Sequence, residues 1–302
     1  MAYNFRERPF SIFSFAFSIS RFRFWIYTAG TYVVGYALGM ENWLAFFQPT
    51  YYLYLFYFFF PANIFIYGVN DLWDEETDRH NPKKSGMEHR LSPEERGVLI
   101  RLLAACGSFS LLLLMIQNNS QRIVFLAFLL LSYFYSARPL RFKEIPILDF
   151  ASNMLYIMPG IFGYLIASGE FPPLAFILAG FLHIAAMHLF SAVPDIEYDR
   201  EAGIRTSAVI FGRRPSLIIC IVFWGCLSML VLWLSGFHPL SVPVLVYPLF
   251  PALLLLRPSM SIEAFYWRLP YINTILGGLL FAAVTLTKLT PSPLACIPFL
   301  PP

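Results

Sequence analysis

Long runs of apolar residues, separated by short polar breaks, make up most of this sequence. About 20 apolar residues in a helix span the hydrocarbon core of a membrane, and a helix satisfies its own backbone hydrogen bonds there. The pattern predicts an all-α, polytopic bundle of nine membrane spans, at about residues 24–40, 43–69, 98–116, 121–136, 148–168, 172–193, 215–236, 238–256 and 270–287. We expect one transmembrane domain over residues 1–302, in which residues 1–23 form an N-terminal cytoplasmic or interfacial segment.

The composition supports a membrane protein. Hydrophobic residues make up 58% of the chain and charged residues only 13%, whereas a soluble domain carries roughly 25% charged residues. A formal net charge of +3 gives no reason to expect a nucleic-acid partner. The four cysteines show no CxxC pairing, so zinc or redox chemistry is not expected.

The distribution of lysine and arginine predicts the orientation. Of the 21 basic residues, 18 lie in the N-terminal segment and in four longer loops, at 70–97, 137–147, 194–214 and 257–269. Basic loops remain in the cytoplasm. We therefore expect the N-terminus and the long loops to be cytoplasmic and the C-terminus to lie outside. An apolar run at 9–20 resembles a signal peptide, but Arg21 and Arg23 follow it at once, which favours an interfacial segment.

An acidic cluster, NDLWDEETD, follows the second predicted span. At ~100° per helical residue, Asn70, Asp74 and Asp78 fall on one face, and Asp71 lies beside them. Stacked carboxylates repel each other unless a cation lies among them. The alternative is a set of solvated loop charges.

A second cluster, DIEYDREAG, follows the sixth predicted span. Asp195 and Asp199 are four residues apart, and Gly203 is expected to continue their helical face without a side chain. Two carboxylate faces without a histidine or cysteine ligand set suit Mg²⁺, which binds a few carboxylates and takes substrate phosphate oxygens as further ligands. A diphosphate bridging the two clusters is the expected partner.

Basic residues near both clusters are candidates for binding the diphosphate. Arginine can donate two parallel hydrogen bonds to phosphate oxygens, and lysine acts as a point charge. The candidates are Lys83, Lys84, Arg138, Arg141, Lys143 and Arg205. Each of them could instead serve only as a topology signal.

These motifs resemble the UbiA superfamily of intramembrane prenyltransferases, whose first motif is NDxxDxxxD and whose second is DxxxDxxxG. The stretch YSARPLRFKEIPILDFASNMLYIMPG at 135–160 is similar to the lycopene elongase branch. The resemblance implies Mg-dependent ionisation of an allylic diphosphate, expected to be dimethylallyl diphosphate, and transfer to lycopene or a related carotenoid end. The magnesium-binding, catalytic residues it implies are Asn70, Asp71, Asp74, Asp78, Asp195 and Asp199. The chain has MEHRLSPEE where many members have an arginine-proline-leucine stretch, so the role of Arg90 stays open.

Several polar and aromatic residues lie close to the expected chemistry. Aromatic faces stabilise a carbocation by ~0.5–2 kcal/mol each, and Tyr67, Tyr135 and Tyr156 are candidates, although interface anchoring is an alternative. Asn153 could orient the acceptor or hydrogen-bond a neighbouring helix. His183 and His188 could act as bases or could simply pack. Whether water or proton loss quenches the product cation stays open.

Other acceptors and another class remain alternatives. A quinone-ring precursor, a chlorophyll precursor or a glycerol lipid could replace the carotenoid. A divalent-cation transporter or channel would place its carboxylates near the bilayer midplane, whereas these lie at span ends. We expect a multi-pass protein of the cell membrane, surrounded by lipid, with its active site facing the cytoplasm.

Overall fold

The computed structural model of the chain describes residues 11–75 and 91–289. Asp78, Lys83, Lys84 and Arg90 lie outside the described residues. Within the described residues every regular element is helical. The α-helices are α1 (Ile12–Ile19), α2 (Ala29–Gly39), α3 (Pro49–Phe59), α4 (Pro61–Trp73), α6 (Pro93–Met115), α7 (Asn119–Phe134), α8 (Leu148–Ala151), α9 (Met158–Ser168), α10 (Leu174–Ala192), α11 (Ile196–Glu201), α12 (Ser207–Phe211), α13 (Arg213–Leu234), α14 (Val246–Leu256), α15 (Ile262–Tyr266) and α16 (Leu269–Leu289). The 3-10 helices are η2 (Phe22–Tyr27), η3 (Trp43–Phe47), η5 (Phe142–Glu144), η6 (Ser152–Tyr156), η7 (Val193–Asp195) and η8 (Pro239–Leu245).

Seven helical stretches in the described part of the chain are long and apolar enough to cross a membrane. They are Pro49–Trp73, Pro93–Met115, Leu148–Ser168, Leu174–Glu201, Arg213–Leu234, Pro239–Leu256 and Ile262–Leu286. The other two predicted spans are also helical, but one is divided into η2 and α2 at Thr28, and the other, α7, has 16 residues. The all-helical membrane architecture is therefore confirmed, while the count of nine spans and the orientation of the termini stay predictions.

An aromatic core holds together the helices of the first half. Tyr32, Tyr57, Phe58, Phe125 and Phe162 are fully buried and come from α2, α3, α7 and α9. Helices α2 and α9 cross closely because both carry glycine at the contact. A Cβ atom on Gly35 would lie 2.0 Å from the carbonyl oxygen of Gly160, and small residues allow such close approach between membrane helices.

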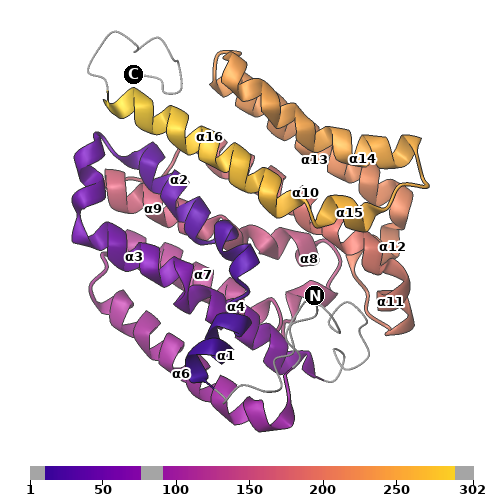
Figure 1. Cartoon of the computed structure of the whole chain (residues 1–302), viewed down its shortest axis with the longest axis horizontal. Helices are drawn as coiled ribbons and strands as arrows, with labels where there is room; N and C mark the ends of the chain where they lie inside the picture. Colours follow the sequence, from indigo (N-terminus) through magenta and orange to yellow (C-terminus); the bar gives the residue numbers. More distant parts are fainter. Residues whose placement is uncertain (1–10, 76–90, 290–302) are drawn as a thin grey trace.

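A second group of helices forms around α10, α13 and α14, with Trp224 fully buried in its core. In Figure 1, α16 runs diagonally between α2 on one side and α13 and α14 on the other. The α16 side chain of Asn273 ties the two groups together. Its amide donates to the Tyr27 hydroxyl at 3.1 Å, and its carbonyl oxygen accepts from the Tyr247 hydroxyl at 2.7 Å. Buried polar bonds of this kind fix the register of neighbouring membrane helices.

The N-terminal helix α1 is buried on one side only. Phe15, Ala16 and Ile19 pack against α4 and α6, whereas Phe13 and Phe17 are exposed. The helix ends at Ser20, and the chain turns through Arg21, whose φ of 49° lies in the left-handed region. This turn directs the arginine toward the end of α4.

Candidate active site

The first aspartate motif lies at the end of α4. The helix ends at Trp73, and Asp74 caps it with its backbone N–H bonded to the carbonyl of Asn70 at 2.9 Å. The Asp71 and Asp74 side chains are only 3% and 5% exposed. They are therefore not the solvated loop charges of the alternative reading, and buried carboxylates require cationic or hydrogen-bonding partners.

Two basic side chains from the loop after α7 bind Asp74. Arg141 Nη2 lies 3.0 Å from Asp74 Oδ1, and Lys143 Nζ forms an ion pair with Oδ2. Asn70 Nδ2 donates to Asp74 Oδ2 at 2.8 Å and to the hydroxyl of Ser136 at 3.0 Å. The counter-charges of this carboxylate are thus supplied by the loop that was predicted to bind phosphate.

Asp71 has a different partner. Its Oδ1 lies 2.6 Å from Arg21 Nη2, and the Arg21 guanidinium lies 4.8 Å from the centre of the Tyr67 ring. The Tyr156 hydroxyl donates to the Tyr67 hydroxyl at 3.3 Å. Tyr67 and Tyr156 therefore form an aromatic wall next to the motif.

The basic loop has a strained backbone. Arg141 has a φ of 42° and Ile147 a φ of 71°, in the left-handed region that β-branched residues rarely adopt. The Lys143 N–H donates to the Tyr135 carbonyl at 3.1 Å, and Arg141 Nε lies 2.6 Å from Glu144 Oε1. Such backbone strain persists only where the surrounding contacts impose it.

A buried carboxylate, Asp149, joins this loop to the region of the second motif. Asp149 is 1% exposed, and its two oxygens accept from the Ser207 N–H at 2.7 Å and from the Ser207 hydroxyl at 2.6 Å. The Ser207 oxygen in turn accepts from the Ile147 N–H at 2.6 Å. Because Ser207 begins the helix that follows the second motif, these bonds hold the two aspartate regions in one framework.

The second motif lies where α10 continues through η7 into α11. Asp195 is the N-cap of α11 and Asp199 lies within it; both are half-buried. The prediction that Gly203 continues their helical face is wrong. Helix α11 ends at Glu201, and Gly203, with a φ of 72°, forms the left-handed turn after it. Glycine commonly ends helices in this way because it has no Cβ.

The donor set fits a hard cation shared with a substrate. Among the residues that the structure describes, no three His, Cys, Asp or Glu side chains gather into a metal site. Each motif does present carboxylate oxygens, and Mg²⁺ commonly binds through one or two carboxylates together with substrate phosphate oxygens.

The remaining predicted site residues differ in their exposure and in their contacts. Arg138 and Arg205 are exposed and make no hydrogen bond or ion pair with other residues in the described ranges. Asn153 is 3% exposed and donates to the Asp149 carbonyl at 2.6 Å, within its own segment. Tyr135 is half-buried, and its hydroxyl lies 3.5 Å from His188 Nε2.

Sequence reasoning missed three contributions. Arg21 was read only as a topology signal, Asp149 had no assigned role, and Ser136 was not singled out. Ser136 and Asp149 both fall within the quoted stretch at 135–160, which gave a usable signal. Arg21 is 50 residues from its partner, and nothing in the local pattern connects the two.

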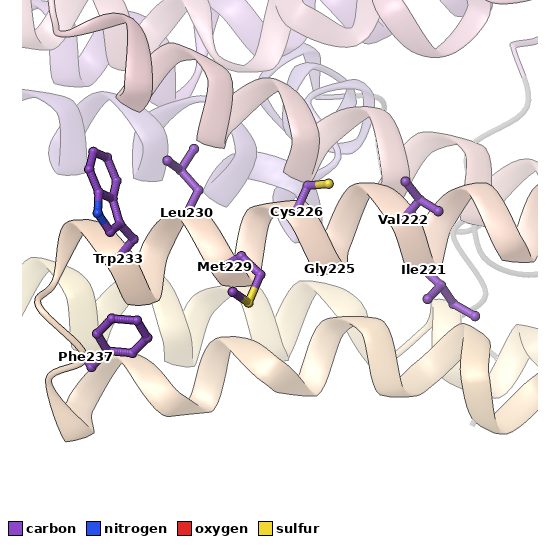
Figure 2. Close-up of a pocket in the computed structure, with 8 residues that line it drawn as sticks. All are labelled: Ile221, Val222, Gly225, Cys226, Met229, Leu230, Trp233 and Phe237. Atoms are coloured by element: carbon purple, nitrogen blue, oxygen red, sulfur yellow. The ribbon is translucent and has the colours of Figure 1, made fainter.

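A large groove lies elsewhere, along α13. It has a volume of about 690 Å³ and is lined by Ile221, Val222, Gly225, Cys226, Met229, Leu230, Trp233 and Phe237. Figure 2 shows these side chains spread along one helix, with Phe237 on the turn after it. Its lining contains no charged residue, so the groove belongs to the apolar outer surface and not to the aspartate site.

A polytopic helical bundle with two aspartate motifs at helix ends defines a class of intramembrane enzymes. Residues 28–264 match the UbiA prenyltransferase family, and the chain belongs to this family.

Similar proteins narrow the class further. The chain is 36% identical over 271 residues to a lycopene elongase/hydratase of Haloarcula japonica, covering 88% of this chain and 90% of that protein. It is 37% identical over 269 residues to a lycopene elongase/hydratase of Halobacterium salinarum, covering 88% and 95%. The fold is similar to that of a UbiA homolog from Archaeoglobus fulgidus bound to GPP and Mg²⁺, with a TM-score of 0.69, 22% identity, and coverage of 89% of this chain and 99% of the other. The same homolog bound to DMAPP and Mg²⁺ gives a TM-score of 0.65 at 21% identity, with the same coverage.

Proposed function

We propose that this chain is a magnesium-dependent prenyltransferase that ionises dimethylallyl diphosphate and transfers the prenyl group to the end of lycopene or a related carotenoid. One observation carries the proposal. The buried Asp74 carboxylate is bound by Arg141 and Lys143, and the loop that carries these two residues is bonded through Asp149 to the segment after the second motif. The names of the similar proteins from Haloarcula and Halobacterium support the carotenoid acceptor.

The two motifs would hold magnesium together with the diphosphate. The proposed ligands are Asn70, Asp71, Asp74, Asp78, Asp195 and Asp199. When bound, the metal acts as a Lewis acid that neutralises charge on the departing diphosphate. The Archaeoglobus homolog of similar fold is bound to DMAPP and Mg²⁺, which supports a diphosphate donor and a divalent metal for this chain.

The basic residues of this chain would then exchange partners. Arg141 and Lys143 bind Asp74 in the structure. In the donor complex these two side chains would bind diphosphate oxygens, to which arginine can bind with two parallel hydrogen bonds. Lys83, Lys84, Arg138 and Arg205 would add positive charge around the same group.

The aromatic wall protects the reactive carbon. Tyr67 is 7% exposed, Tyr156 is bonded to it, and the Tyr27 and Tyr156 ring centres lie 6.1 Å apart. Ring faces stabilise a cation, and a pocket among membrane helices keeps out the water that would destroy it. We assign Tyr67, Tyr135 and Tyr156 to this role, and Asn153 to the orientation of the acceptor.

The position of the carboxylates disfavours a cation transporter. Asp74 follows the last residue of the span Pro49–Trp73, and Asp199 lies near the end of the span Leu174–Glu201. A transported ion is usually bound near the bilayer midplane.

We also propose that residues 1–302 form one domain of a multi-pass cell-membrane protein, with lipid around it and the active site facing the cytoplasm. The excess of basic residues in the N-terminal segment and the long loops supports this orientation. A membrane-impermeant thiol reagent applied to intact cells should label Pro239→Cys, at the exposed start of η8, and not Glu197→Cys on α11. The reverse labelling pattern would invert the orientation.

The function is tested by expressing the chain in a lycopene-producing host and measuring pigment masses. We expect products that carry added five-carbon units, and no such products with Asp74→Ala or Asp199→Ala. Unchanged lycopene despite folded protein that still releases diphosphate from the donor would indicate another acceptor, such as a quinone-ring precursor, a chlorophyll precursor or a glycerol lipid. Absence of both activities would contradict the enzymatic assignment.

A further inference from the structure

Tyr135, one residue of the proposed aromatic wall, meets a histidine that the proposed transfer step does not use. The Tyr135 hydroxyl, at the end of α7, lies 3.5 Å from His188 Nε2 on α10, and the two rings are perpendicular with centres 6.0 Å apart. Both residues are only half-buried. Part of each residue is therefore accessible to a water molecule.

The surroundings of this pair are polar. The Asp149 carboxylate lies near the His188 ring, and the Asn153 amide lies near the Tyr135 hydroxyl. Asp149 is 1% exposed and makes no ion pair within the described part of the chain. A buried carboxylate without a cationic partner stabilises a positive charge placed close to it.

The pair also lies at the depth where an acceptor would react. His188 precedes Asp195 by seven residues, which is ~10 Å along a helix. The Tyr135 carbonyl accepts from the Lys143 N–H at 3.1 Å, and Lys143 binds Asp74. The pair therefore lies directly below the residues assigned to the diphosphate.

We propose that Tyr135 and His188 hold the water molecule that captures the cation formed on the acceptor, and that His188 takes the proton from it. This inference rests on the proposed prenyl transfer. A buried water needs two to four polar partners, and the tyrosine hydroxyl and the imidazole nitrogen provide two of them. A water bound at this pair would also provide for hydration of the product, which the name lycopene elongase/hydratase of the two similar proteins implies for them.

The step balances in atoms and charge. The acceptor double bond supplies the electron pair for the new carbon–carbon bond as the donor carbon–oxygen bond breaks, and diphosphate leaves with that bond's electrons. The neighbouring acceptor carbon becomes a tertiary cation. The water oxygen bonds to this carbon, one water proton passes to His188, and an alcohol results. Without the water, a proton leaves an adjacent carbon and a new double bond forms instead.

The test compares hydrated with dehydrated five-carbon products in the lycopene-producing host. With wild-type protein we expect the hydrated product, and growth in isotopically labelled water should label its hydroxyl oxygen. His188→Phe keeps a ring of similar shape but cannot accept a proton, so the ratio of dehydrated to hydrated product should rise at least about tenfold. His188→Gln, which can still bind water, should shift the ratio in the same direction by less.

His183→Phe is the matched control. His183 lies on the same helix, packs with its ring centre 4.7 Å from that of Tyr247, and contacts neither Tyr135 nor Asp149 through any bond among the described residues. It should leave the product ratio unchanged. If His188→Phe does not accumulate, His188→Gln decides.

Three results would overturn the inference while the proposed function stands: five-carbon products that contain no added oxygen in the wild type, an unchanged ratio in the decisive His188 variant, or an equal shift in His183→Phe. If the wild type adds no five-carbon unit at all, it is the proposed function that fails.

Discussion

The two aspartate motifs have the same spacing but lie in different environments. Asp71 and Asp74, at the end of α4, are 3% and 5% exposed and are bound by arginine and lysine side chains from distant parts of the chain. Asp195 and Asp199, on η7 and α11, are half-buried at the end of a long helix. The first motif is therefore buried within the fold, whereas the second is partly exposed. Two motifs with the same proposed role in metal binding can therefore contribute differently to the stability of the fold.

The largest expected effect is on prenyl transfer. Asp74→Asn and Asp199→Asn should each lower the transfer rate by at least about 10³-fold, because each removes charge that holds the metal and the departing diphosphate. Glu197→Gln is the control, since Glu197 is exposed on the same helix as Asp199. It should retain a rate close to that of the wild type. A similar loss in the control would show that α11 is sensitive to any change of charge.

Substitutions in the two motifs should have different effects on the free energy of unfolding. Asp74→Ala removes a buried carboxylate that both Arg141 and Lys143 bind, and should lower the free energy of unfolding by about 3–5 kcal/mol. Asp199→Ala, at a half-buried position, should lower it by less. Thermal unfolding in nanodiscs measures both. Equal losses would remove the distinction between the motifs.

The basic loop should affect donor binding. Arg141 contacts both Asp74 and Glu144. Arg141→Lys replaces its planar guanidinium group by an ammonium group, which cannot donate two parallel hydrogen bonds, and should raise KM for the allylic diphosphate about tenfold. Arg138→Lys, at an exposed position, should raise it less. Arg213→Lys, at the start of α13, should leave KM unchanged. The proposed exchange of partners requires this order, and steady-state kinetics at saturating acceptor would show it.

The smallest effect concerns the backbone that links the motifs. Ile147 has a φ of 71° and its side chain is 57% exposed. Because only glycine adopts this conformation without strain, Ile147→Gly should be more stable than Ile147→Ala by about 1 kcal/mol. Both variants lack the isoleucine side chain, so the difference between their free energies of unfolding reports mainly the backbone conformation. Equal stability would mean that the link is not strained.

Much of the fold was predictable because membrane helices follow apolar length. Seven predicted spans were found as long apolar helices, and the two shorter ones are still helical. The break at Thr28 was missed because both of its neighbours are apolar. Gly203 was misassigned because spacing alone cannot distinguish a glycine within a helix from one that ends it.

The site was predictable to the extent that its residues are close in sequence. The motif spacing predicts Asp71, Asp74, Asp195 and Asp199 as site residues, and the structure brings the loop at 137–147 against the first motif through Arg141 and Lys143. Long-range partners such as Arg21 with Asp71 and Ser207 with Asp149 were not predictable, since nothing local specifies contacts made 50 or more residues away.

In the proposed site both motifs bind one diphosphate. Binding of an unreactive thio analogue of dimethylallyl diphosphate tests this arrangement most directly. Calorimetry in nanodiscs would compare the wild type, Asp74→Asn and Asp199→Asn with and without Mg²⁺. We expect Mg-dependent binding by the wild type and at least about tenfold weaker binding by each variant. Unchanged binding in either variant, or binding by the wild type that does not depend on Mg²⁺, would contradict a diphosphate held between the two motifs.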